Sequence, residues 1–136
     1  FGQLSRSEQL HSLNVLRAVL RQGHTPHDLA VAALLHDAGK AYYPLAIWQK
    51  TLVVLVRAFL PALFKHWGAG DPPEFWKRPF VVAVKHPAWG AEMVAKTGAT
   101  ERTLWLIAHH ADTLSTWSDH PYVSLLARLQ RADDAN

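Results

Sequence analysis

The segment Leu34-Leu35-His36-Asp37-Ala38-Gly39-Lys40 joins an apolar run to two adjacent side chains that can bind metal. Neighbouring residues on a helix point about 100° apart, so His36 and Asp37 can face one centre only where the helix ends. We expect Gly39 to end it in the left-handed conformation, which leaves Lys40 beside that centre. An imidazole and a carboxylate suit Zn, Fe or Mn, and a carboxylate can bridge two ions. The alternative is a hydrogen-bonded structural pair.

Further metal-binding side chains occur in segments that the apolar periodicity predicts to be helical, at positions that could face inward. His86 precedes a proline and has no packing reason to be histidine. Asp133 lies near a helix end where the helix dipole disfavours an acid, which suggests a compensating cation. His109 and His110 diverge by about 100°, so we expect one to bind a metal directly. The full set outside the central pair is His11, His86, His109, His110 and Asp133.

Several helix boundaries can be read from capping residues and prolines. Ser5-Arg6-Ser7-Glu8 has the Ser-x-x-Glu pattern of a helix start. Thr25-Pro26 predicts a second start, with Thr25 as the cap. Pro61 should kink or break a helix, and Pro87 should open a new one after a short buried helix ending at His86. The last helix is predicted over 122–132.

Composition limits the class of protein. At 136 residues the chain can bury a core as one domain, and without cysteine it has neither disulfides nor thiolate ligands. We therefore expect a reducing, cytoplasmic setting. The formal charge of +3 comes without a clustered basic stripe, which disfavours binding to a nucleic-acid duplex. Because the chain begins at Phe1, we expect it to be a trimmed part of a longer protein.

The most apolar region, 42–67, invites a membrane interpretation. Lys50, Arg57 and Lys65 interrupt it, so no uncharged run is long enough to span a bilayer. We favour a helix that lines the mouth of the site and is broken at Pro61. An amphipathic membrane-surface element over 45–67 is the weaker alternative. Its interfacial anchors would be Trp48, Phe59, Phe64 and Trp67.

The spacing of these motifs resembles the HD-domain superfamily of metal-dependent phosphohydrolases, in its form with two metals. The matching strings are Leu10-His11-Ser12, His36-Asp37-Ala38-Gly39-Lys40, His86-Pro87-Ala88-Trp89-Gly90-Ala91-Glu92, Ile107-Ala108-His109-His110 and Arg131-Ala132-Asp133-Asp134. The resemblance implies an all-α fold, a single compact bundle of about six to seven helices over 1–136. It also implies that residues 41–78 form a variable insert lining the site.

The same resemblance implies a set of ligands and roles. Two divalent transition metals are expected, with Fe or Mn favoured and Zn, Co or Ni as alternatives. Asp37 would bridge the ions and take part in catalysis, and Lys40 would hold a phosphate oxygen of the substrate. His109 is favoured over His110 as the direct ligand, while His110 would contact the second ion or the substrate. The implied ligands are His11, His36, Asp37, His86, His109 or His110, and Asp133.

The implied function is hydrolysis of a phosphoester or phosphoanhydride bond by a metal-activated water, with a nucleotide or dinucleotide as the substrate. After His110 the chain lacks the Asp-Gly-x-Gly-Tyr-Pro string of HD proteins that hydrolyse cyclic-di-GMP, which disfavours that subgroup. Trp48, Trp67 or Trp89 could stack on a base. Two alternatives stay open: a nucleotide- or metal-sensing regulatory module with little turnover, and a structural helical protein with a coincidental cluster. The sequence makes no prediction of oligomeric state.

Overall fold

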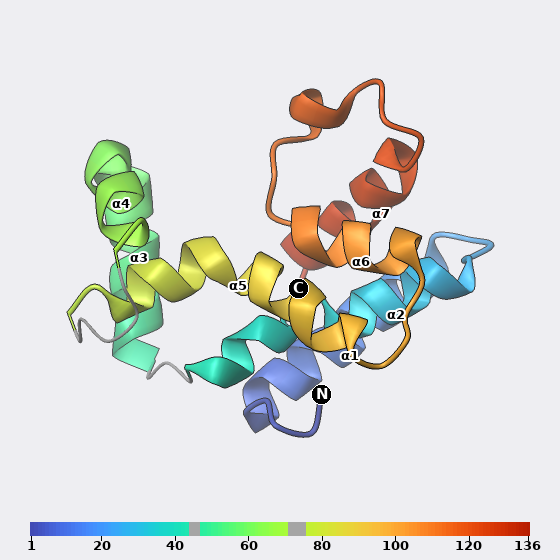
Figure 1. The fold of residues 1–136 in the computed structure, drawn as a ribbon, viewed down its shortest axis with the longest axis horizontal. Helices are drawn as coiled ribbons and strands as arrows, with labels where there is room; N and C mark the ends of the chain where they lie inside the picture. Colours follow the sequence, from blue (N-terminus) through green and yellow to red (C-terminus); the bar gives the residue numbers. More distant parts are fainter. Residues whose placement is uncertain (44–46, 71–75) are drawn as a thin grey trace.

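The computed structural model describes residues 1–43, 47–70 and 76–136, and within these ranges the chain is entirely helical (Figure 1). Seven α-helices and two short 3-10 helices follow one another, as the resemblance implied. They are α1 (Arg6–Arg21), α2 (His27–Leu35), η1 (Ala38–Tyr42), α3 (Ile47–Phe59), α4 (Pro61–Gly68), α5 (Arg78–Ala95), α6 (Glu101–His109), η2 (Leu114–Trp117) and α7 (Val123–Asp134).

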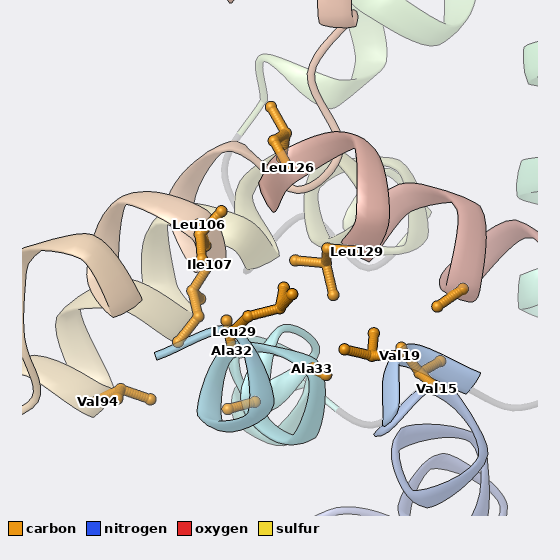
Figure 2. Packing of buried hydrophobic residues seen from close by; sticks show 12 residues of the cluster. Val15, Val19, Leu29, Ala32, Ala33, Val94, Leu106, Ile107, Leu126 and Leu129 are labelled. Atoms are coloured by element: carbon orange, nitrogen blue, oxygen red, sulfur yellow. The ribbon is translucent and has the colours of Figure 1, made fainter. Parts of the chain in front are cut away.

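The main hydrophobic core surrounds α2. Val15 and Val19 of α1 meet Leu29 of α2, and Leu106 and Leu129 close the core from α6 and α7 (Figure 2). All five side chains are fully buried. The helix start at Ser5 is confirmed, because Ser5 and Glu8 form a capping box.

Two glycines allow η1 to lie directly against α5. A Cβ atom on Gly39 would collide with the backbone carbonyl oxygen of His86 and would lie 2.7 Å from the amide nitrogen of Gly90. A Cβ on Gly90 would in turn lie 3.2 Å from the nitrogen of Gly39. The absence of both side chains brings the turn that carries Asp37 and Lys40 up to the helix that carries His86.

The helices α3 and α4 form a hairpin at the end of α5 away from the main core (Figure 1). The hairpin has a small core of its own, in which Val53, Val56 and Phe64 pack on Phe80. The predicted break at Pro61 is confirmed, because α3 ends at Phe59 and α4 begins at Pro61. The helix α6 begins after Thr100, whose side chain accepts a hydrogen bond from the Thr103 amide.

The hairpin does not display all four aromatic side chains named as membrane anchors. Phe64 is buried and Trp67 packs on Phe80, whereas Trp48 and Phe59 are exposed. No described helix combines the length and the apolar character needed to cross a bilayer. Contact with a membrane surface stays a prediction, now restricted to the outer side of α3.

Three sequence-based expectations about helix ends were wrong. Pro87 does not open a helix, because α5 runs continuously from Arg78 to Ala95 through it. Gly39 is not left-handed, because the chain turns from α2 through Asp37 (φ −93°, ψ 6°) into the right-handed helix η1. The last helix extends to Asp134 rather than ending at Ala132.

The cap at the start of α2 also differs from the expectation. Pro26 occupies the cap position, and the Thr25 hydroxyl instead donates to the carbonyl oxygens of Val19 and Gly23. Asp28, in the first turn of α2, accepts from Arg102 and Thr100 and so ties α2 to α6.

Candidate metal centre

Six side chains from across the sequence meet in the middle of the bundle. His11 comes from α1, His36 and Asp37 from the turn after α2, His86 from α5, His110 from the residue after α6, and Asp133 from the last turn of α7. We call these six residues the His/Asp cluster. His36 is fully buried, and Asp37, His86 and His110 are nearly so. His11 and Asp133 are partly exposed and form the side of the cluster that faces solvent.

Asp37 lies at the centre of the cluster, with its two carboxylate oxygens facing different groups. Its Oδ2 lies 3.6 Å from the Nε2 atoms of both His11 and His36. Its Oδ1 lies 3.2 Å from His86 Nε2 and 3.7 Å from His110 Nε2. The carboxylate thus lies between His11 and His36 on one side and His86 and His110 on the other.

Asp133 completes the first of these sides. Its Oδ1 lies 2.9 Å from His11 Nε2 and 3.4 Å from His36 Nε2. An acid at the end of α7 opposes the helix dipole, so its position requires nearby positive charge. The imidazoles of His11 and His36 are the groups beside Asp133 that can carry this charge.

Three histidines share one orientation. The Nδ1 atoms of His36, His86 and His110 lie 2.9, 2.9 and 2.7 Å from the carbonyl oxygens of Ala33, Val82 and Ile107. A carbonyl oxygen only accepts hydrogen bonds, so each Nδ1 carries the proton. Each Nε2 is then free to present a lone pair to the cluster. This backbone support of Nδ1 is the usual way in which a metal-binding histidine is oriented.

The lone pairs converge in a way that requires a shared cation or proton. His86 Nε2 and His110 Nε2 lie 3.2 Å apart, and two lone pairs repel at that distance. Among the described residues, His36 Nε2 is buried and has no hydrogen-bond partner. The groups His11/His36/Asp133 and His36/Asp37/His110 each offer ligand atoms within 4.8 Å of one another. The donor set of imidazole nitrogens and carboxylate oxygens therefore fits a divalent metal ion.

A model of the HD-domain family matches residues 10–134, nearly the whole chain. The chain belongs to the HD-domain family. Members of this family are generally metal-dependent phosphohydrolases. No curated protein and no solved structure matches the sequence.

The electrostatics of this HD domain keep its central carboxylate ionised. Burial alone would raise the pKa of Asp37, but the nearby His110 and His86 and the charges of His36 and Lys40 hold this pKa well below its ordinary value. The carboxylate is therefore available to a metal ion without having to lose a proton first.

The other members of the cluster respond to the same charges. Burial would raise the pKa of Asp133, but His11 and His36 hold it far below its ordinary value. Burial would lower the pKa of His36, but Asp133 and Asp37 raise it. Burial lowers the pKa of His86. Without metal the carboxylates thus favour a proton on His36, and a metal ion would take the place of that proton.

The expected preference for His109 over His110 is reversed by the geometry. His110 Nε2 points into the HD domain's cluster, whereas His109 Nδ1 lies 2.6 Å from Asp112 Oδ2. The His109 ring also packs between Trp105 and Trp117, and Trp117 donates to the same Asp112 oxygen. His109 therefore belongs to an aromatic cluster beside the site rather than to the His/Asp cluster.

This difference predicts opposite outcomes for two matched substitutions. His110→Gln should weaken Mn²⁺ binding by more than about tenfold, because it removes an inward-facing imidazole. His109→Gln should leave Mn²⁺ affinity within about twofold and cost about 1 kcal/mol of unfolding free energy through its lost hydrogen bond. Calorimetric titration with Mn²⁺ and denaturant unfolding would measure the two effects. Equal losses of affinity in both variants would contradict the assignment of His110.

Two cavities adjoin the cluster. The larger, of about 440 Å³, lies over it and is lined by His11, Asp37, His86, His110 and Asp133 among others. The smaller, of about 240 Å³, lies beside it between α3 and α5. Lys40, Arg57 and His86 line both. Lys40 Nζ is 2.7 Å from Asp37 Oδ2, so its ammonium group is next to the cluster as expected for a residue that meets a bound anion.

Arg57 and Gln130 are two polar lining residues that the sequence did not mark as part of a site. Arg57 was treated only as a charge interrupting an apolar run, although a cation seven residues after Lys50 shares its side of a helix. Gln130 donates to the carbonyl oxygens of His110 and Asp112 and so fixes the turn that carries His110. No signal in the local sequence marks it.

The three tryptophans proposed to stack on a base do not line these cavities. Within the described ranges, Trp48 is exposed on α3 and Trp67 packs in the hairpin. Trp89 borders a separate surface pocket with Tyr42 and Tyr43. Recognition of a base by these rings has no support in the geometry.

Proposed function

We propose that this HD domain is a phosphohydrolase that cleaves a phosphoester or phosphoanhydride bond, in a nucleotide or dinucleotide, with the help of two divalent metal ions. The observation that carries the proposal is the convergence of the Nε2 atoms of His36, His86 and His110 on the two oxygens of Asp37. The Nδ1 atom of each of these histidines lies within hydrogen-bond distance of a backbone carbonyl oxygen. Such an arrangement requires protons or cations among these atoms, and a metal ion bound there would replace the protons.

The chain's own residues support two ion positions. His11, His36 and Asp133 would hold one ion, His86 and His110 the other, and Asp37 would bind both through its separate oxygens. The nitrogen and oxygen donors suit Fe, Mn, Zn, Co and Ni alike, and the resemblance to the HD-domain superfamily favours Fe or Mn among them. Bound ions would acidify a water molecule and neutralise negative charge on a phosphoryl group.

Residues around the larger cavity would orient the substrate and exclude bulk water. Lys40 would orient a phosphate oxygen, because its ammonium group reaches the cluster edge while 30% of its side chain stays exposed. The buried Asp37 and its histidines exclude bulk water from the floor of the cavity. Hydrolysis then adds the water oxygen to phosphorus, and the proton passes to the leaving oxygen as its bond to phosphorus breaks.

A nucleotide panel tests the proposal. Protein purified without a histidine tag would be loaded with Mn²⁺ or Fe²⁺ and incubated with nucleoside mono-, di- and triphosphates, dinucleoside polyphosphates and cyclic dinucleotides. We expect chromatography to show metal-dependent release of phosphate or nucleotide from at least one class, and EDTA to abolish it. Tight binding of both metal and nucleotide without turnover would instead support the regulatory alternative.

A further inference from the structure

The smaller cavity differs chemically from the larger one. The larger cavity has four carboxylates in its lining: Asp37, Asp112, Asp133 and Asp134. The smaller cavity has one, Glu8, together with three cations and an apolar wall; the cations are Lys40, Lys50 and Arg57, and the wall is Val53, Val54, Val82 and Ala83. The smaller cavity therefore offers positive charge, away from the carboxylates of the larger one, to a second anionic group of a substrate.

Two of the three cations already have carboxylate partners. Lys40 Nζ lies 2.7 Å from Asp37 Oδ2, and Lys50 Nζ lies 3.0 Å from Glu8 Oε1. Arg57 has no carboxylate partner in the part of the chain that the structure describes. Its guanidinium carbon lies 4.8 Å from the centre of the Phe64 ring, which holds the group in place without neutralising it.

Arg57 also occupies the position at which the two cavities adjoin, since it lines both of them with Lys40 and His86. A guanidinium group is charged at every physiological pH and offers two parallel donors that match two phosphate oxygens. A phosphoryl group over the His/Asp cluster would thus leave a neighbouring anionic group close to Arg57.

We propose that Arg57 binds the second phosphoryl group of a phosphoanhydride, so that the substrate is a nucleoside di- or triphosphate or a similar pyrophosphate-linked compound rather than a monoester. This inference rests on the proposed hydrolase function and narrows its substrate class. The attacked phosphoryl group lies over the His/Asp cluster, and the next one lies between Arg57 and Lys40. The valine wall takes a less polar part of the substrate.

Binding of two small phosphonates tests the role of Arg57 without turnover. Methylenediphosphonate carries two linked phosphorus groups that cannot be hydrolysed apart, and methylphosphonate carries one. Each would be titrated calorimetrically into protein with Mn²⁺ in fixed excess over the probe, with blank titrations for chelation. We expect the wild type to bind the diphosphonate more than about tenfold more tightly, as one charge-assisted contact commonly contributes.

Three variants separate the contribution of Arg57 to anion binding from general changes in charge or folding. Arg57→Gln should lose about tenfold in affinity for the diphosphonate and less than about twofold for methylphosphonate. Arg57→Lys should retain part of the preference, because it keeps the charge but not the paired donors. Arg21→Gln removes the same charge from an exposed position that lines neither cavity and should change nothing. Thermal unfolding would confirm that each variant is folded.

The outcomes distinguish this inference from the proposed function. Unchanged affinity of Arg57→Gln for the diphosphonate, or no preference in the wild type, would overturn the role of Arg57 even if the protein hydrolyses nucleotides. An Arg57-dependent preference in a protein that turns over no phosphorylated compound would support the anion site and refute the hydrolase. Preferred turnover of diphosphates that Arg57→Gln reduces through KM would support both.

Discussion

Asp37→Asn is expected to lower phosphohydrolase turnover by about 10³-fold or more and to reduce the metal bound per chain. Asn keeps the shape of the side chain but supplies neither the negative charge nor the second anionic oxygen. Both sides of the His/Asp cluster meet at this one carboxylate, with His11 and His36 on Oδ2 and His86 and His110 on Oδ1. Loss of several kcal/mol of charge stabilisation corresponds to the expected decrease in rate.

The fold should survive this substitution, which makes the result interpretable. Removing a buried charge removes its desolvation cost, and Lys40, which loses its partner, is 30% exposed and can be solvated. The buried His36 also loses Asp37 but keeps Asp133, whose Oδ1 lies 3.4 Å from its Nε2. We therefore expect the metal-free variant to unfold at a temperature close to that of the metal-free wild type. Added Mn²⁺ should raise the midpoint of the wild type more than that of the variant.

Elemental analysis and turnover on the same samples would measure both effects. Asp134→Asn is the matched control, because Asp134 also lines the larger cavity but is exposed and has no contact with the cluster's imidazoles. It should keep its metal and most of its activity. An Asp37→Asn protein that retains full metal content and turnover would refute the central role given to Asp37.

The sequence predicted which residues lie in the His/Asp cluster better than it predicted the direction in which each side chain points from its helix. His11, His36, Asp37, His86 and Asp133 each interrupt an apolar pattern without a packing reason, and the structure brings all five together. His109 and His110 interrupt the same pattern and differ only in direction. The packing of Trp105 and Trp117 on His109 decides that direction, and these are tertiary contacts that a helical period does not contain.

Pro87 shows that the course of the backbone also depends on tertiary packing that the local sequence does not contain. A proline removes one helical hydrogen bond and crowds the preceding turn, so the sequence alone predicts an interruption. In the structure α5 continues through it, with Pro87 buried. The burial of Phe80, Val81 and Val94 along one helix compensates for the local cost. The close approach of η1 to α5 at Gly90, in contrast, depends directly on the missing side chain.

Gly39→Ala is expected to destabilise the protein by about 3 kcal/mol and to weaken metal binding as well. The added methyl group would collide with the carbonyl oxygen of His86 and lie 2.7 Å from the nitrogen of Gly90, both backbone atoms of α5 that cannot rotate away. Relief requires η1 to move from α5. That movement would carry Asp37 away from His86, whose Nε2 now lies 3.2 Å from Asp37 Oδ1.

Denaturant unfolding and Mn²⁺ titration of three alanine variants would test this argument. Gly90→Ala should be milder than Gly39→Ala, since its nearest contacts are at 3.2 and 3.3 Å and alanine favours a helix by about 1 kcal/mol over glycine. Gly2→Ala meets no atom within 4 Å and should be neutral. The contrary result is that Gly39→Ala matches Gly2→Ala in both unfolding free energy and affinity for Mn²⁺. That result would refute the claim that the close contact between η1 and α5 positions Asp37 against His86.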